Sequence, residues 1–263
     1  MDYGIAGKRA LVTGSTSGIG WAAARALAAE GVRVCINGRT LERVEDAVLR
    51  LRQAVDGSVQ GIAADLGTAA GCAALVEVLP DVDILVNNLG IFEPRPFEAT
   101  SDEDWLRIFE VNVMSGIRLC RHYLPGMRQR GWGRIVFVSS ESGQQIPADM
   151  IHYGVTKTAL LALSRGLAET LAASGVTVNT VVPGPTATEG AVAFFQQLAQ
   201  ERGCSAEAVQ RAFLEEHRPS SLLRRLATPD EVAAMIAYVC SRQAAATTGA
   251  ALRVDGGVVR SIT

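Results

Sequence analysis

Short β-branched runs alternate with amphipathic stretches along almost the whole chain of 263 residues, and this alternation constrains the fold more than any other feature. The short runs are apolar on both sides and are expected to be strands at 9–13, 32–37, 59–63, 84–87, 135–139, 176–182 and 251–254. Helical patterns fill most of the gaps, at 19–30, 41–54, 69–78, about 102–130, 151–173 and 229–240. Strands of this kind, separated by helices, form a parallel sheet that helices cover on both faces. The sequence therefore predicts an α/β fold of the doubly wound (Rossmann) type with seven parallel strands.

Residues 186–220 depart from this alternation, because they contain no strand pattern. Phe194 and Phe195 stand there among polar residues, between the end of a strand and the last helix. No linker rich in Gly, Pro or Ser and no internal repeat divides the chain. We therefore predict a single domain over residues 1–263, with a small helical lid at about 186–220 over the site.

The charge and the cysteine content exclude several classes of protein. Net charge is -2 at pH 7 with acidic and basic residues intermixed, so no basic patch points to nucleic acid or to an anionic membrane. The five cysteines lack C-x-x-C spacing and the histidines lie far apart, so we expect reduced, mostly buried thiols and no metal site. No apolar run approaches the ~18 residues of a membrane span, and no signal segment is recognisable. The expected partner is a small molecule, and the expected location is the cytoplasm.

A glycine-rich turn follows the first expected strand and leads into an Ala-rich helix. Glycines let the backbone turn tightly and approach a pyrophosphate, while the helix amino terminus offers free N–H groups and the positive end of its dipole. The spacing is G-x-x-x-G-x-G, and the alternative is a strand-to-helix turn that only packs closely. The residues expected to bind the cofactor here are Gly14, Ser15, Thr16, Ser17, Gly18, Ile19 and Gly20.

The end of the second expected strand indicates which nicotinamide cofactor is used. A carboxylate at this place would bind a ribose 2′-OH, but the chain has Arg39 and no acid, so we predict NADP(H), with NAD(H) possible. The alternative for Arg39 is a solvated side chain on a loop. Asp65, after the third expected strand, either accepts from the adenine amino group or caps the next helix, and Leu66 beside it is assigned to the cofactor site.

Tyr153 and Lys157 lie four residues apart inside the expected helix 151–173. Residues at this spacing share one face of a helix. An unperturbed tyrosine titrates near ~10, but an ammonium beside the phenol favours the ionised form and lets it exchange a proton near neutral pH. Taken alone, such a pair also occurs by chance on helices that have no catalytic role.

Further motifs run in order along the chain: Asn87-Asn88-Leu89-Gly90, Asn112 in Glu110-Val111-Asn112-Val113, Ser139-Ser140, Pro183-Gly184 and Val254-Asp255-Gly256-Gly257. With the glycine turn and the Tyr/Lys pair, they resemble the short-chain dehydrogenase/reductase family, in its 3-oxoacyl reductase-like branch, over essentially the full length. The resemblance implies an NAD(P)-dependent enzyme that acts on CH–OH or C=O groups. It also implies a homotetramer or homodimer.

The resemblance implies a role for each matching residue. Tyr153 would be the general acid and base, and Ser140 would hold the substrate carbonyl oxygen, with Ser139 packed or bonded to the backbone. Lys157 would bond the nicotinamide ribose and, together with the positive ring of the cofactor, lower the pKa of Tyr153. Asn112 would interrupt its helix and hold a water that relays protons from Lys157. Further cofactor contacts would come from Asn88, Leu89, Gly90, Tyr153, Lys157, Pro183, Gly184, Thr186 and Thr188.

Two departures from the family pattern affect the cofactor site. Leu89 stands where Ala is usual and adds bulk without removing a polar contact. Ser17 stands where many NADP-preferring relatives carry a basic residue, which leaves Arg39 as the main support for NADP(H).

Substrate identity is open at this level. The residues expected to border the pocket, with Ser140 and Tyr153, are Glu141, Gln144, Gln145, Ile146, Met150, Phe194 and Phe195. They favour a partly apolar substrate, although the two phenylalanines can equally pack the lid onto the sheet. A 3-oxoacyl thioester, a steroid-like or aromatic ketone and a sugar-derived carbonyl all fit a ketone reductase. The alternatives are an NAD-dependent alcohol dehydrogenase and a non-catalytic nucleotide-sensing protein.

Overall fold

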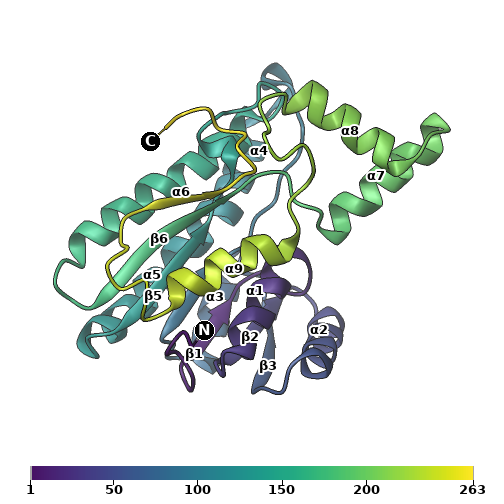
Figure 1. The fold of residues 1–263 in the computed structure, drawn as a ribbon. Coiled ribbons are helices and arrows are strands. Elements are labelled where there is room, and N and C mark those ends of the chain that lie inside the picture. The colour runs from purple at the N-terminus through teal and green to yellow at the C-terminus, as the bar shows by residue number, and fades with distance from the viewer. Residues whose placement is uncertain (1, 263) are drawn as a thin grey trace.

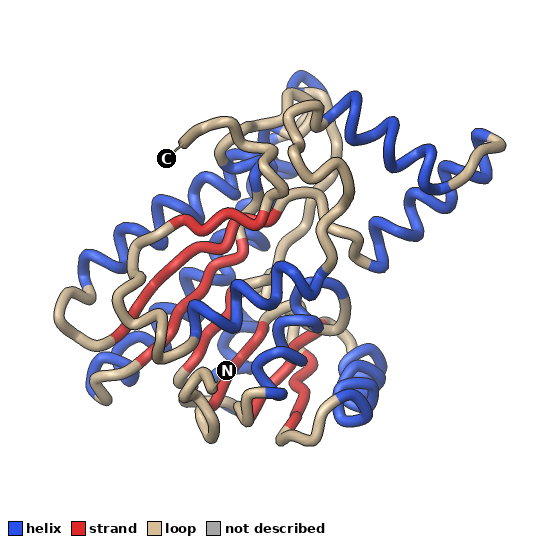
Figure 2. The backbone as a smooth tube through the Cα atoms, viewed as in Figure 1, coloured by secondary structure: helices blue, strands red, loops and turns tan. Residues whose placement is uncertain are grey.

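A seven-stranded parallel sheet forms the centre of the molecule in the computed structural model, which describes residues 2–262. The strand order is β3-β2-β1-β4-β5-β6-β7 (Figures 1 and 2). The strands are β1 Arg9–Val12, β2 Arg33–Gly38, β3 Val59–Ala63, β4 Ile84–Asn87, β5 Gly133–Val138, β6 Val176–Pro183 and β7 Ala251–Val254. The predicted doubly wound α/β fold is confirmed, because every neighbouring pair of strands is parallel and the chain order reverses between β1 and β4.

Helices cover both faces of the sheet. The first face carries α1 Gly18–Ala29, α2 Leu41–Ala54 and α9 Pro229–Cys240. The second face carries α3 Ala69–Val78, α5 Ser115–Gln129 and α6 Ile151–Thr170 (Figure 1). Helix α6 ends three residues before the predicted limit, and Ala173 beyond it has a positive φ of 59°. Such a backbone conformation does not continue a right-handed helix.

Alternate side chains of each strand enter opposite cores. Val12 and Ile36 pack with α1, α2 and α9, whereas their neighbours Leu11 and Cys35 pack with α3, α5 and α6. Successive strand side chains point to opposite faces, so a strand between two helical layers is apolar over most of its length. Strands β5 and β6 are buried along their whole lengths. The buried polar residues in these two strands are Arg134, Thr177, Asn179 and Thr180.

The predicted helix 102–130 is interrupted. Helix α4 covers Asp102–Phe109, a π-helical turn covers Glu110–Met114, and α5 begins at Ser115. Asn112 lies inside the π turn, and its carboxamide bonds the backbone of Ile91 in both directions. A π turn inserts one residue into the helical ladder and turns the side chains beyond it. The interruption expected at Asn112 is therefore present.

Residues 186–220 form two further helices, α7 Glu189–Arg202 and α8 Ala206–His217. They pack on each other through a small apolar cluster of their own, in which Phe195, Ala199, Val209 and Leu214 are buried. In Figure 1 the pair (green) extends away from the body of the sheet. The prediction that residues 186–220 contain no strand is confirmed. The apolar cluster between the two helices is separate from the two main cores.

The cysteines agree with the prediction of reduced, mostly buried thiols. All five are free, and Cys35, Cys72, Cys120 and Cys240 are buried. Between residues 2 and 262, no helix combines the length and the apolar character that a membrane crossing needs.

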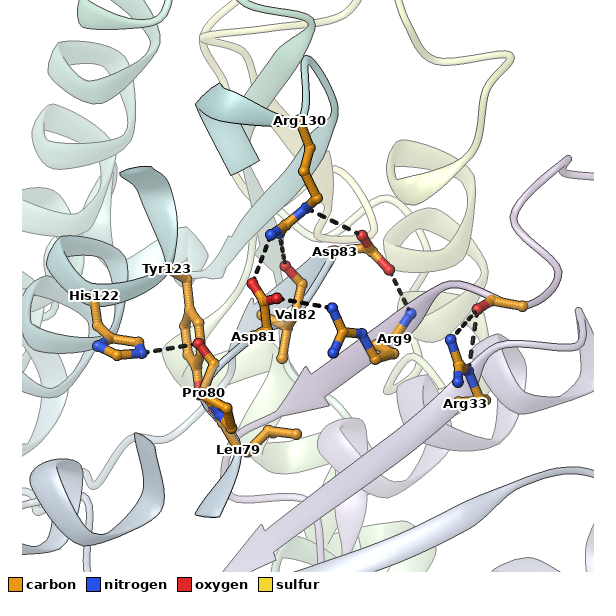
Figure 3. Close-up of polar contacts among 11 residues, drawn as sticks. Arg9, Arg33, Leu79, Pro80, Asp81, Val82, Asp83, His122, Tyr123 and Arg130 are labelled. Carbon is orange, nitrogen blue, oxygen red and sulfur yellow. Dashed lines mark hydrogen bonds and ion pairs between the residues drawn. The ribbon is translucent and has the colours of Figure 1, made fainter. Parts of the chain in front are cut away.

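A polar network ties the amino-terminal edge of the sheet together (Figure 3). Arg130, just after α5, binds Asp81 at 2.6 Å, and Asp81 also binds Arg9 of β1 at 3.1 Å. The Asp83 carboxylate accepts from the backbone N–H of Arg9 at 2.9 Å. Beside this network, the buried Tyr123 donates its hydroxyl to the carbonyl of Leu79 at 2.8 Å. These bonds fix the loop between α3 and β4 to α5. They lie at the edge of the sheet opposite to the carboxyl ends of the strands.

Replacing Tyr123 by Phe is expected to lower the free energy of unfolding by about 1–2 kcal/mol, because the buried Leu79 carbonyl loses its donor. Urea denaturation followed by circular dichroism measures the change. Tyr3→Phe is the matched control, since among residues 2–262 the Tyr3 hydroxyl has no hydrogen-bond partner. Equal stability of the two variants would contradict the assigned role of the hydroxyl.

Candidate active site

Four strands bring polar or glycine-rich segments to one edge of the sheet. Gly14 follows β1, Asn88 follows β4, Ser140 follows β5 and Gly184 follows β6. The carboxyl ends of parallel strands all lie at this edge, and the crevice where the strand order reverses is the usual ligand site of doubly wound folds. The sheet therefore gathers most of the predicted site residues.

The glycine turn has the geometry that its sequence predicts. Gly14 and Gly18 have positive φ angles of 57° and 58°, which other residues adopt only with strain. A Cβ on Gly20 would lie 2.5 Å from the Asn88 side-chain nitrogen, so only glycine fits there. Asn88 in turn donates to the carbonyl oxygens of Thr13 and Gly14, each at 2.9 Å. The predicted cofactor residue Asn88 thus braces the turn itself.

The other side chains of the turn differ in what they contact. Ser15 is fully buried and donates to the carbonyl of Val12 at 2.6 Å. Thr16 packs its methyl group where a side chain on Gly38 would stand. Ser17 occupies the N-cap position of α1 without a side-chain cap bond. Backbone N–H groups and the hydroxyl of Ser17 are therefore available to an anion at this turn.

Glu189, at the start of α7, supplies an anion at this place. Its Oε2 accepts from the backbone N–H of Gly18 at 2.7 Å. The neighbouring Thr188 caps α7 by accepting from Ala191, and its methyl group lies against Gly18. A carboxylate on the first turn of α1 shows that the helix end accepts negative charge, so the turn fits the pyrophosphate of a dinucleotide. No sequence signal had singled out Glu189.

Arg39 lies exposed just beyond β2. It has no hydrogen-bond or ion-pair partner among the described residues 2–262, so its guanidinium is free to bind an external phosphate. Asp65 does not cap α3, because Thr68 takes that position, and its carboxylate instead accepts from Gly67 N–H at 3.1 Å. Leu66 is buried in the core, which leaves only its backbone for a cofactor.

Lys157 is buried on α6 and points at the ends of β4 and β5. Its Nζ donates to the carbonyl of Val138 at 3.1 Å and lies 5.5 Å from the ring centroid of Tyr153. A Cβ on Gly90 would come within 3.2 Å of Nζ, so the glycine leaves room for the ammonium. Burial lowers the pKa of Lys157 to about 8. The predicted pair therefore lies together, on one side of its helix.

Burial and three neighbouring polar side chains act on the pKa of Tyr153. Burial raises the pKa of the phenol, and hydrogen bonding with Ser140 opposes this effect. The charge of Glu141 raises the pKa further, and that of Arg218 lowers it. Withdrawal from water disfavours the phenolate and the ammonium alike. The lowering expected from Lys157 together with the cofactor ring stays a prediction.

Ser140 makes a bond that its sequence does not predict. Its hydroxyl donates to Glu141 Oε2 at 2.5 Å and accepts from Ser142 N–H at 3.1 Å. Glu141 Oε1 accepts from Nε of Arg218 at 2.7 Å, across 77 residues of sequence. Ser139 donates to the carbonyl of Lys157 at 2.8 Å, which confirms that this serine is bonded to the backbone.

Asn112 is buried beside the pair. In addition to the Ile91 backbone, its carboxamide donates to the hydroxyl of Thr156 at 3.0 Å. A Cβ on Gly90 would lie 3.6 Å from Asn112 Oδ1, so the carboxamide flanks the same glycine as the ammonium of Lys157. The side chain of Asn112 therefore fixes the segment after β4 to α6.

The rim of the site carries exposed apolar groups. Phe92 is 66% exposed and sets its ring against that of Tyr153, with 6.1 Å between centroids. Ile146 is 48% exposed and lies over Gly154, next to the tyrosine, and Gln144 and Gln145 beside it are exposed. Phe92 was missed by the sequence motifs, because its contact with Tyr153 joins segments far apart in the chain.

The two phenylalanines of the predicted lid lie in different environments. Phe194 is 57% exposed, whereas Phe195 is buried in the cluster between α7 and α8. Phe195 therefore packs the helical pair, and Phe194 is available at its surface. His152 is buried against Trp105, with ring centroids 6.0 Å apart, and burial lowers its pKa.

The segment after β6 closes the site. Pro183 pairs with Val254 in the sheet, and a Cβ on Gly184 would lie 2.6 Å from the carbonyl oxygen of Asp255. Thr186 donates to the carbonyl of Gly184 at 2.9 Å. This turn places the start of α7, with Thr188 and Glu189, opposite the glycine turn of α1.

A family model described as enoyl-(acyl carrier protein) reductase matches residues 14–259. The chain is 46% identical to "Uncharacterized oxidoreductase YvaG" of Bacillus subtilis over 263 residues, with 100% of both sequences covered. The chain belongs to the short-chain dehydrogenase/reductase family. The resemblance found in the motifs is thereby confirmed.

Other members of the family are also similar over nearly the whole chain. D-beta-hydroxybutyrate dehydrogenase of Cupriavidus necator is 35% identical, with 96% of this chain and 98% of the relative covered. L-sorbose reductase of Gluconobacter frateurii, solved with NADPH and L-sorbose, matches with a TM-score of 0.94 at 34% identity and covers 100% of each chain. This short-chain dehydrogenase/reductase is an NAD(P)-dependent oxidoreductase that acts on CH–OH or C=O groups of small molecules.

Replacing Glu189 by Gln is expected to tighten binding of NADPH and NADH by about two- to fivefold, because the carboxylate competes with the pyrophosphate for the end of α1. Nucleotide titration followed by intrinsic fluorescence measures the affinity. Glu201→Gln, at the other end of α7, is the control and should leave it unchanged. Weaker binding in Glu189→Gln would show that the carboxylate supports the cofactor instead.

Proposed function

We propose that this protein is an NADP(H)-dependent ketone reductase whose proton donor is Tyr153. The observation that carries the proposal is the meeting of Tyr153, Ser140 and the buried Lys157 at the carboxyl ends of β4 and β5. A non-catalytic nucleotide-binding protein has no need of a phenol, a hydroxyl and an ammonium at one point. Membership of the family indicates the general chemistry, and we propose a role in it for each of these three residues.

The bound nicotinamide supplies the hydride that the carbonyl carbon takes up. As the carbonyl π bond breaks, its electron pair moves to the oxygen, which takes the proton of Tyr153 and becomes the alcohol. Ser140 lies beside the phenol and stabilises the developing negative charge on that oxygen. Burial raises the pKa of Tyr153, which keeps the phenol protonated before the reaction, as a proton donor must be.

Lys157 and Asn112 return the proton. The ammonium of Lys157 lies 5.5 Å from the Tyr153 ring, and its pKa of about 8 lets it give up a proton near physiological pH. Asn112 flanks the same glycine, Gly90, and belongs to a π turn whose backbone departs from the helical ladder. We infer that a water beside Asn112 carries protons from Lys157 to solvent.

Arg39 supports NADP(H) over NAD(H). It is exposed, and within residues 2–262 no acid or carbonyl engages it, so a 2′-phosphate meets a free guanidinium. Related structures were solved with NADPH or with NADP. Asp65 is exposed beyond β3 and is proposed to face the adenine, while Leu66, Leu89 and Gly90 border the cofactor mainly through their backbones.

The substrate is proposed to have an apolar part. Phe92 and Ile146 are exposed beside Tyr153, and Phe194 is exposed on α7. We propose that the α7–α8 segment, residues 186–220, is the lid over this pocket. Assembly of the chain into a homotetramer or homodimer is proposed from the family resemblance alone.

Replacing Tyr153 by Phe should lower reductase activity about 10²- to 10⁴-fold, because the proton donor is lost. A screen of carbonyl compounds with NADPH and with NADH, followed by the absorbance of the reduced nicotinamide, provides the assay. Cofactor affinity should stay close to that of the wild type. Tyr238→Phe on α9 is the control. Retained activity in Tyr153→Phe would exclude the proposed role.

Replacing Arg39 by Gln should weaken NADPH binding about 10- to 100-fold, because charge-assisted bonds to the 2′-phosphate are lost. NADH affinity should change little. Arg202→Gln at the end of α7 serves as the control. Equal or better use of NADH by the wild-type enzyme would favour the alternative, an NAD-dependent alcohol dehydrogenase.

A further inference from the structure

Glu141 and Arg218 form the most buried ion pair at the site. The side chain of Glu141 is 5% exposed and that of Arg218 is 12% exposed, and Nε lies 2.7 Å from Oε1. Ser142 also donates to Oε1, at 3.2 Å, while Ser140 donates to Oε2 at 2.5 Å. A carboxylate withdrawn from water needs such partners, because an unpaired buried charge is costly. The motif of the family does not account for either residue.

We propose that Glu141 and Arg218 are positioning residues, which set the direction of the Ser140 hydroxyl and connect it to the α7–α8 segment. A hydroxyl has one hydrogen, and Ser140 gives it to Glu141 while the backbone N–H of Ser142 occupies a lone pair. The hydroxyl is therefore held in a defined orientation beside Tyr153. This inference rests on the catalytic roles proposed for Tyr153 and Ser140.

Arg218 decides how firmly Glu141 keeps that hydrogen. When Arg218 is paired with Oε1, the negative charge of the carboxylate is partly neutralised, and its hold on Ser140 weakens. The hydroxyl can then turn to the substrate oxygen, where negative charge develops during reduction. Without Arg218 the full charge of the carboxylate keeps the hydrogen, and the substrate oxygen loses a donor.

The position of Arg218 gives this contact a second consequence. Arg218 directly follows α8 and is its C-cap residue. At the other end of the segment, Glu189 contacts Gly18 in the glycine turn. Because α7 and α8 share an apolar cluster of their own, they form one packed unit that reaches from the cofactor turn to the catalytic serine. Any shift of this unit changes the contact between Arg218 and Glu141.

Steady-state kinetics test the pair with ethyl acetoacetate and its alcohol, ethyl 3-hydroxybutyrate, as probes. We expect Arg218→Met to lower kcat about 10- to 100-fold with a smaller change in KM, because the unpaired carboxylate of Glu141 then keeps the Ser140 hydrogen. Glu141→Gln removes that charge and should lower kcat less. The double variant should resemble Glu141→Gln, and Arg218→Lys should recover part of the activity lost in Arg218→Met. Arg211→Met, on the exposed side of α8, is the matched control.

The pH profile of alcohol oxidation separates positioning from a general loss of structure. The charged side chains around Tyr153 are Lys157, Glu141 and Arg218, and oxidation requires the deprotonated phenol. Arg218→Met removes a cation, which raises the pKa of the Tyr153 phenol and moves the rising limb of the profile to higher pH. Glu141→Gln removes an anion, which lowers the pKa of the same phenol and moves that limb to lower pH. Shifts in the same direction, or none, would overturn the proposal.

Hydrogen–deuterium exchange tests the connection without turnover. Glu141→Gln should raise exchange in residues 206–217, and Arg218→Met should raise it in residues 141–143. Exchange in the Arg211→Met control should match that of the wild type. If the wild type reduces no carbonyl compound, the proposed function fails. If each substitution affects only its own segment, the inference fails, whatever the activity.

Discussion

All strands of the sheet run parallel, so their carboxyl ends meet at one edge, and the site depends on this constraint. The glycine turn follows β1, the Asn88 segment follows β4, and the serine follows β5. These segments lie far apart in the sequence, and only the fold brings them together. The reversal of strand order between β1 and β4 leaves the crevice, and α1 begins there with its free N–H groups.

Packing at this edge is close, and most polar side chains there form hydrogen bonds with backbone groups. Asn88 braces Thr13 and Gly14, Ser15 bonds Val12, and Asn112 bonds Ile91. Buried polar groups must find partners, and the nearest partners are the carbonyl and N–H groups of the turns. The groups left over for a ligand are therefore few, and they include the free guanidinium of Arg39, whereas the N–H of Gly18 already donates to Glu189.

Burial also sets the electrostatics of the catalytic residues. It raises the pKa of Tyr153 and lowers that of Lys157, because each group loses hydration of its charged form. The buried carboxylate of Glu141 pairs with Arg218 at 2.7 Å. The same withdrawal from water thus favours a protonated donor, a weakly basic amine and a paired carboxylate within one site.

The sequence by itself determined the sheet, because a strand buried between helical layers is apolar over most of its length. It also placed Gly14 and Ser140 just after strands, and Tyr153 with Lys157 on one face of a helix. It could not reveal the bond between Ser140 and Glu141, the pairing of Glu141 with Arg218, or the contact of Glu189 with Gly18. Those contacts join residues up to 171 positions apart, and no local pattern encodes which of many charged side chains will meet. Only the tertiary structure decided them, since burial and proximity, which fix charge pairs and pKa values, exist only once the chain has folded.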